Sequence, residues 1–160
     1  MTVFDEELAT TAANMLKVMY AAQGVGLAAP QVGINLKLMV FNQHADAESK
    51  KVREEHEKIF VNPSIVKMSD ELFSDEEGCL SFPHIYGQVI RSNQVDVEYQ
   101  TLTGEHKSVT YEGELAQIFQ HEYDHLDGVL LVDRMAEDDK QLMQSRLGRL
   151  IAKHGPGGAL

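Results

Sequence analysis

Two histidines and a glutamate in the second half of the chain form the pattern His-Glu-x-x-His. They are His121, Glu122 and His125. Residues four apart in an α-helix lie one turn apart on the same face, so both imidazoles can bind one metal ion. Glu122 lies beside them as a candidate general base. The pattern indicates a hydrolytic metal site; the alternative is a pair of ordinary helix histidines beside a surface glutamate.

A catalytic site of this kind usually has a third protein ligand, which the sequence after His125 does not supply. One common pattern would place a histidine at position 131, where this chain has Leu131. Another takes a glutamate from a later helix, but the last glutamate is Glu137, which is too close. The third ligand must then come from upstream, where the one cysteine, Cys79, is a candidate. A free cysteine is also often a small core residue, so both interpretations remain open.

Three motifs follow one another along the chain. GVGLAAPQ begins at Gly24, EGCLS at Glu77 and QHEYDHLDG at Gln120. In this order they resemble the peptide deformylase family, with the family's spacings from about Phe4 to about Met135. The segment EGCLSFP is most similar to the plastid and related bacterial type of that family.

The resemblance implies one metal ion per chain, bound by Cys79, His121 and His125 with water in the fourth position. It implies Fe²⁺ as the physiological ion, with Zn²⁺, Ni²⁺ or Co²⁺ able to replace it. The implied reaction removes the N-formyl group from the initiator methionine of nascent polypeptides at the ribosome and releases formate. In that reaction metal-bound hydroxide attacks the formyl carbon, and Glu122 serves as general base and then as general acid.

The same resemblance implies roles for residues around the metal. The backbone N–H of Leu80 and the side-chain amide of Gln31 would stabilise the oxyanion. Arg91 would either hydrogen-bond near the active-site loop or be an ordinary surface arginine. Asp75 and Glu76 stand where relatives often carry an apolar pocket residue. The residues predicted to bind the substrate or line its methionine pocket are Gly26, Val25, Ile118, His121 and Tyr86.

The elements that must position these residues follow from hydrophobic periodicity and turn signals. We predict helices at 4–22, 114–126 and 136–154, strands at 36–41, 59–61, 65–73, 89–99, 108–111 and 129–132, and a charged connector at 44–58 that is prone to disorder or insertion. Segregated strands and helices indicate an α+β fold. The resemblance implies antiparallel sheets packed around a central helix that carries His-Glu-x-x-His, with a further helix at the C-terminus.

Length and composition limit the function classes. A chain of 160 residues can form one domain, and we expect a single catalytic domain at 1–154, without the family's N-terminal strand, and a flexible tail at 155–160. The net charge of −11 argues against a broad nucleic-acid surface. No apolar run approaches the roughly 20 residues of a membrane span. The single cysteine and the lack of a visible targeting signal favour the cytoplasm, or an organelle stroma or matrix after processing, rather than secretion.

Two other functions remain open at this level. A general metallopeptidase would cleave unformylated peptides and would use a third ligand other than Cys79. A binding protein of the same fold without catalysis would have no need for Glu122. Formate release from a formylated peptide, measured with and without Glu122→Ala, separates these alternatives from a deformylase.

Overall fold

The computed structural model describes residues 3–154, so the tail predicted at 155–160 lies outside the described residues. Its strands pair antiparallel throughout. They form a five-stranded sheet in the order β1-β2-β3-β6-β7 and a two-stranded sheet of β4 and β5. The elements are α1 (Glu6–Ala21), β1 (Gly26–Ala28), η1 (Ala29–Val32), β2 (Leu38–Phe41), α2 (Lys50–His56), β3 (Lys58–Met68), β4 (Leu72–Cys79), β5 (Phe82–Ser92), β6 (Gln94–Gln100), β7 (His106–Glu112), α3 (Glu114–Leu126), α4 (Leu131–Arg134) and α5 (Glu137–His154). The α+β prediction is confirmed.

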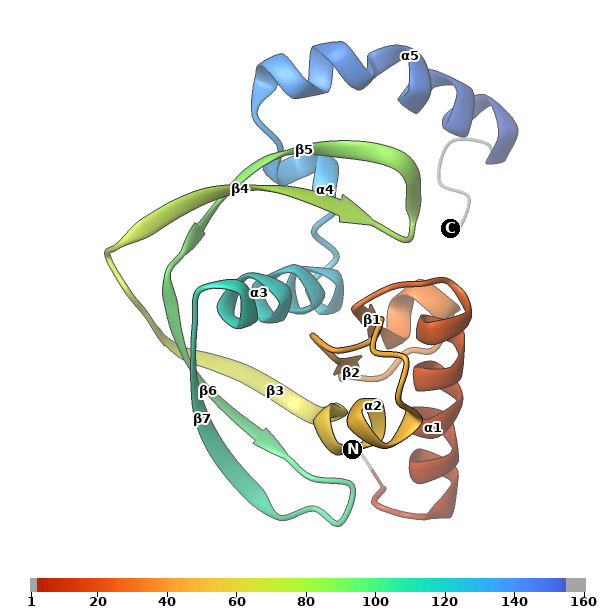
Figure 1. Cartoon of the computed structure of the whole chain (residues 1–160), viewed down its shortest axis with the longest axis vertical. Coiled ribbons are helices and arrows are strands. Elements are labelled where there is room, and N and C mark those ends of the chain that lie inside the picture. The colour runs from red at the N-terminus through yellow and green to blue at the C-terminus, as the bar shows by residue number, and fades with distance from the viewer. Residues whose placement is uncertain (1–2, 155–160) are drawn as a thin grey trace.

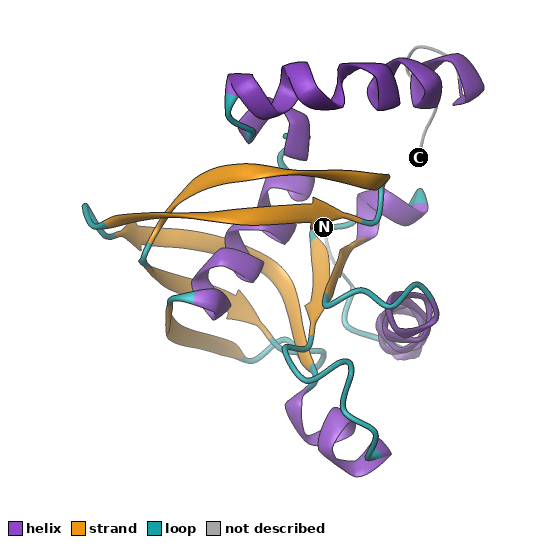
Figure 2. Cartoon of the chain, turned by 45° about the horizontal axis from the view of Figure 1, so that its top comes forward, coloured by secondary structure: helices purple, strands orange, loops and turns teal. Residues whose placement is uncertain are grey.

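Helix α3 lies at the centre of the fold and has the predicted bounds. It lies between the β4–β5 hairpin and the five-stranded sheet, which wrap around it (Figures 1 and 2). On its sheet side, the fully buried Phe119 ring packs against Phe60 at a centroid distance of 5.2 Å. This aromatic core fixes the rotation of α3 about its axis, and its histidines are thereby directed away from the sheet, toward β4 and β5.

Two outer helices pack on parts of the sheets. Helix α1 begins at Asp5, whose carboxylate accepts a hydrogen bond from the Leu8 N–H, and packs on β1 and β2. Helix α5 crosses the outer side of the β4–β5 hairpin (Figure 1), where Leu147 packs against the cluster that contains Ile85. Both helices were predicted within a few residues of their observed ends. No helix in the range 3–154 has both the length and the apolar character that crossing a bilayer demands.

Strand boundaries differ from the sequence predictions in three places. Asn62 and Pro63 do not separate two strands, because β3 runs through them with a register shift between Val61 and Ser64. Such an irregularity accommodates a proline that cannot donate a ladder hydrogen bond. The predicted strand 65–73 is divided by a turn between β3 and β4. The predicted strand 89–99 is divided at Asn93, where the chain passes from one sheet to the other.

Two predictions of local structure were wrong. The charged connector at 44–58 contains α2, which Ser49 caps and which carries i,i+4 ion pairs such as Lys50–Glu54. The predicted strand at 129–132 is instead the start of α4, because the Asp133 carboxylate accepts a hydrogen bond from the Leu130 N–H and closes a helical turn. A four-residue apolar run does not distinguish a buried strand from a buried helical turn.

Candidate active site

Cys79, His121 and His125 lie together where the end of β4 faces α3. One ligand atom from each residue lies within 4.8 Å of the other two, and Cys79 Sγ is 3.3 Å from His125 Nε2. Two ligands of a tetrahedral metal are about 3.5 Å apart when each is bound at roughly 2.0–2.3 Å. The three side chains therefore have the spacing and the chemistry to hold one borderline-soft cation, although Cys79 and His121 lie 42 positions apart in the sequence.

Glu77 fixes the orientation of the His121 ring. Its Oε2 atom lies 2.8 Å from His121 Nδ1, and a carboxylate can only accept, so Nδ1 donates the hydrogen bond. The other ring nitrogen, Nε2, is then the one available to a metal. Glu77 and Cys79 are two positions apart in β4, which puts both side chains on the same face of the strand. The sequence analysis did not identify Glu77 as a functional residue, although this spacing was visible.

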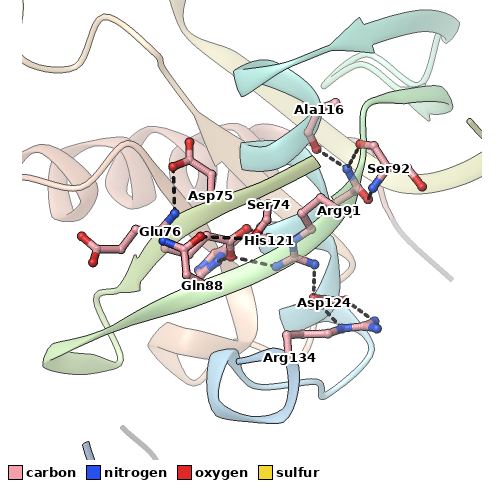
Figure 3. A network of polar contacts seen from close by, with 12 residues as sticks. Ser74, Asp75, Glu76, Gln88, Arg91, Ser92, Ala116, His121, Asp124 and Arg134 are labelled. Carbon is pink, nitrogen blue, oxygen red and sulfur yellow. Dashed lines mark hydrogen bonds and ion pairs between the residues drawn. The ribbon is translucent and has the colours of Figure 1, made fainter. Parts of the chain in front are cut away.

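Arg91 is buried and anchors Glu77, so its interpretation as a surface arginine is excluded. It donates two hydrogen bonds of 2.9 Å to the Glu77 carboxylate and one of 2.6 Å to Asp124. Asp124 also accepts two hydrogen bonds from Arg134 of α4. Arg91, Asp124 and Arg134 therefore form a row of side chains of alternating charge that links β5, α3 and α4, as Figure 3 shows. The network holds β4 and α3, and with them the candidate ligands, in one arrangement.

A second set of hydrogen bonds fixes α3 against the end of β5 (Figure 3). The Gln120 side-chain amide donates to the carbonyls of Ser92 and Ala116, both at 2.9 Å, and its oxygen accepts from the Ser92 N–H. Gln120 therefore prevents α3 from sliding along β5.

The electrostatics of the cluster favour a thiolate. Burial raises the pKa of Cys79, but hydrogen bonds from His121 and His125 outweigh it and lower that pKa to about 6. Burial likewise opposes the charged form of His121, yet its hydrogen bonds to Cys79 and Glu77 raise its pKa to about 10. A cation has to displace the imidazolium proton when it binds, as is general for histidine ligands. Burial raises the pKa of Glu77, but Arg91 and His121 hold it at about 2.

Glu122 is buried beside this cluster. Its Oε2 atom has no hydrogen-bond partner among the described residues, and burial raises the pKa of Glu122 to about 7. Gly26 of β1 makes room for it, because a Cβ at Gly26 would lie 2.3 Å from Glu122 Oε1. A carboxylate with an unpartnered oxygen and a pKa near neutrality suits proton transfer.

The glutamine predicted to face the reacting carbonyl also lies at this cluster. Gln31 Nε2 donates to Ser81 Oγ at 3.0 Å and lies 3.6 Å from Cys79 Sγ, while Oε1 accepts from the Ala28 N–H. These contacts hold the amide next to the sulfur. Ser81 is a contributor that the sequence analysis did not single out.

A pocket of about 730 Å³ opens above the cluster. Tyr86, which is 47 % exposed, packs its ring on Gly78 at the mouth of the pocket. His125 is buried and does not contribute to the lining, and neither does Asp75. The residues singled out from the sequence that line this pocket are Val25, Gly26, Gln31, Glu76, Cys79, Leu80, Tyr86, Ile118, His121 and Glu122.

Comparison with known proteins gives consistent matches. The family model described as polypeptide deformylase matches residues 1–141. The chain is 44 % identical over 153 residues to the chloroplastic/mitochondrial peptide deformylase 1B of Arabidopsis thaliana, an alignment that covers 95 % of this chain and 54 % of the relative. It therefore spans about half the length of that plant protein. It is 45 % identical over 151 residues to peptide deformylase of Treponema pallidum, which covers 94 % of this chain and 85 % of the relative.

Solved structures agree with these matches. A crystal structure of peptide deformylase from Plasmodium falciparum superposes with a TM-score of 0.91 at 38 % identity, covering 96 % of this chain and 87 % of that one. A plant peptide deformylase structure gives a TM-score of 0.87 at 44 % identity, covering 96 % and 80 %. The similarity extends over the fold and over the sequence.

Proposed function

Because the chain belongs to the polypeptide deformylase family, we propose that it is a metal-dependent hydrolase that removes the N-formyl group from the initiator methionine of nascent polypeptides and releases formate. The observation that carries the proposal is the convergence of Cys79, His121 and His125 within 4.8 Å, with the carboxylate of Glu122 next to them. The relatives' names specify a deformylase, and this cluster supplies groups suited to amide hydrolysis.

We propose that Cys79, His121 and His125 hold one ion per chain, with Fe²⁺ as the physiological metal and Zn²⁺, Ni²⁺ or Co²⁺ as substitutes. The donor set fits such an ion, since thiolate and imidazole suit iron and zinc while oxygen-rich sites suit magnesium or calcium. A metal bound there supplies Lewis acidity, which lowers the pKa of water and polarises a carbonyl group.

The residues around the ligands have three further roles, which are proton transfer, stabilisation of the oxyanion and binding of the substrate. Glu122 Oε2 accepts a proton from the attacking water and returns it to the nitrogen of the leaving amine. The Leu80 N–H and Gln31 Nε2 donate hydrogen bonds to the oxygen of the formyl group as negative charge develops on it, and one such donor contributes on the order of 3 kcal/mol. Val25, Ile118 and Tyr86 line the pocket that receives the substrate.

The test is formate release from formyl-Met-Ala-Ser by the metal-loaded protein and its Glu122→Ala variant. We expect release by the wild type and a loss of at least about 10²-fold in the variant, in the range assigned to positioned acid–base groups. The variant should keep its metal. Cleavage of unformylated peptide bonds would instead support a metallopeptidase, and no formate release by fully metal-loaded wild type would refute the proposal.

A further inference from the structure

Two histidines away from the active site lie against each other in the connector between β2 and β3. His44 follows β2, and His56 is the last residue of α2, twelve positions later. Their ring centroids are 4.3 Å apart and their planes meet at 66°. The candidate ligands His121 and His125 have a similar arrangement, with centroids 5.1 Å apart and planes at 77°. The connector therefore holds a second pair of imidazoles at the spacing of metal ligands.

The distance between these two rings indicates the geometry that a shared ion would have. Two imidazoles bound to one ion at roughly 2.0–2.1 Å have centroids about 5.2 Å apart when the angle at the ion is tetrahedral, and about 4.5 Å apart at a right angle. The observed 4.3 Å is closer to the right angle. Ions that prefer tetragonal geometry, such as Cu²⁺ and Ni²⁺, have right angles between neighbouring ligands and bind imidazole well. The pair therefore suits these ions better than tetrahedral Zn²⁺.

The His56 ring is already oriented for a metal. Its Nδ1 atom lies 2.8 Å from the Val52 carbonyl oxygen, and a carbonyl can only accept, so Nδ1 donates the hydrogen bond. The other nitrogen, Nε2, then carries the free lone pair. Glu77 fixes the His121 ring in the same way at the active site. His56 therefore has both the nitrogen that binds a metal and the outer partner that orients such a ligand.

The His44 ring is free to turn toward the same ion. The His44 backbone N–H donates to Asn42 Oδ1 at 2.9 Å, and Asn42 is fully buried, so the start of the connector is fixed. The ring itself makes no hydrogen bond to any residue between 3 and 154. The χ2 torsion of histidine is soft, so a ring nitrogen can rotate toward an ion without movement of the backbone. Both histidines are half-buried, which leaves room for water on a bound ion.

We propose that His44 and His56 together bind one divalent transition-metal ion, with Cu²⁺ and Ni²⁺ preferred over Zn²⁺, at an auxiliary site apart from the catalytic one. Neither residue lines the active-site pocket. Among the described residues, no third histidine, cysteine or carboxylate joins the pair within 4.8 Å, so water completes the coordination. The ion links the two ends of the connector, and α2 buries no side chain of its own. A metal clip that closes such a loop stabilises it by reducing the freedom of the unfolded chain. The proposal is independent of the deformylase function.

The test adds Cu²⁺ to protein that already holds one Ni²⁺ per chain at the active site. We expect one Cu²⁺ per chain, an electron paramagnetic resonance spectrum with splitting from two imidazole nitrogens, and no thiolate-to-copper absorption band. The affinity, measured by competition with glycine, should fall at least about tenfold in His44→Ala and in His56→Ala, since loss of even an outer partner of a ligand costs about 10- to 100-fold. His106→Ala removes another exposed histidine and should keep the wild-type affinity.

A clip also protects the connector from proteolysis, which binding to either histidine alone would not do. Trypsin cleaves after lysine, and Lys50 and Lys51 are exposed in the connector. Saturating Cu²⁺ should slow cleavage there about tenfold in the wild type, because cleavage requires local unfolding. His44→Ala should show no such protection, and it controls for any effect of copper on trypsin. Uptake of Cu²⁺ only in place of Ni²⁺, an affinity unchanged in both variants, a spectrum with one imidazole nitrogen, copper-dependent dimers or unprotected cleavage in the wild type would each overturn the proposal.

Discussion

Glu77 Oε2 accepts a hydrogen bond of 2.8 Å from His121 Nδ1, between two residues 44 positions apart. The bond fixes both the tautomer and the plane of the imidazole, and Arg91 holds Glu77 in turn. A carboxylate in this position acts on the metal through the ligand it orients.

Replacing Glu77 with glutamine should weaken metal binding about 10- to 100-fold, the usual effect of losing such an outer partner. The amide keeps the size of the side chain but can no longer neutralise Arg91. Competition with a chelator measures the affinity, and the Co²⁺ absorption spectrum reports the ligand geometry. Glu76→Gln changes the neighbouring exposed residue and serves as the control. Equal affinities in the two variants would contradict a positioning role for Glu77.

Arg91→Met should cost about 3–5 kcal/mol of unfolding free energy, because it leaves two buried carboxylates, Glu77 and Asp124, without their shared cation. Lys107→Gln breaks an exposed pair with Glu105 and should leave the free energy of unfolding nearly unchanged, because solvent screens such a pair. Urea unfolding measures the stability of both variants. A chelator is present so that metal binding does not contribute to the result. A loss in Arg91→Met as small as in Lys107→Gln would show that Arg134 can replace Arg91.

The contrast between helix α3, which carries the two histidines, and the polar network that joins α3 to β4 and β5 shows what the sequence can predict. The bounds of α3 followed from a local apolar pattern, and the spacing of its histidines predicted that both imidazoles lie on one face of the helix. The burial of Arg91 could not be predicted from the sequence. Its hydrogen-bond partners are 14 and 33 residues away, and they meet Arg91 only because β5 packs on α3. The strand break at Asn93 was missed for a similar reason, since β5 and β6 both alternate and the sequence carries no sign that they belong to different sheets.

Tyr111 should make the fold sensitive to alkali. Burial, with a smaller contribution from the charge on Tyr99, raises the pKa of Tyr111 to about 12 from an ordinary value near 10. Since the folded-state pKa is the higher one, the stability linked to it is complete below about pH 10 and is lost as the pH rises through about 12. Two pKa units correspond to about 2.7 kcal/mol. Urea unfolding measured from pH 9 to 11.5 should show that the free energy of unfolding falls less steeply with pH in Tyr111→Phe than in the wild type. Parallel plots of that free energy against pH would contradict a contribution from Tyr111.

Gly26→Ala should slow formate release while leaving the metal in place. The new Cβ would lie 2.3 Å from Glu122 Oε1 and 2.6 Å from its Cδ, so the carboxylate must move. The backbone of Gly26 lies outside the left-handed region, so the substitution strains no dihedral angle there. A displacement of about 1 Å in a reacting group can cost about 10²-fold in rate, and we expect the loss mainly in kcat because Glu122 acts in the chemical step.

Gly148→Ala is the matched control, because its Cβ would meet no atom within 4 Å and it lies in α5, away from the pocket. That variant should keep the wild-type rate and gain up to about 1 kcal/mol of stability from the better helix propensity of alanine. Metal analysis of both variants separates displacement of Glu122 from loss of the ion. If Gly26→Ala kept full kcat, the carboxylate would have another productive position. The absence of a side chain at Gly26 would then serve the passage of the substrate along β1 rather than the placement of Glu122.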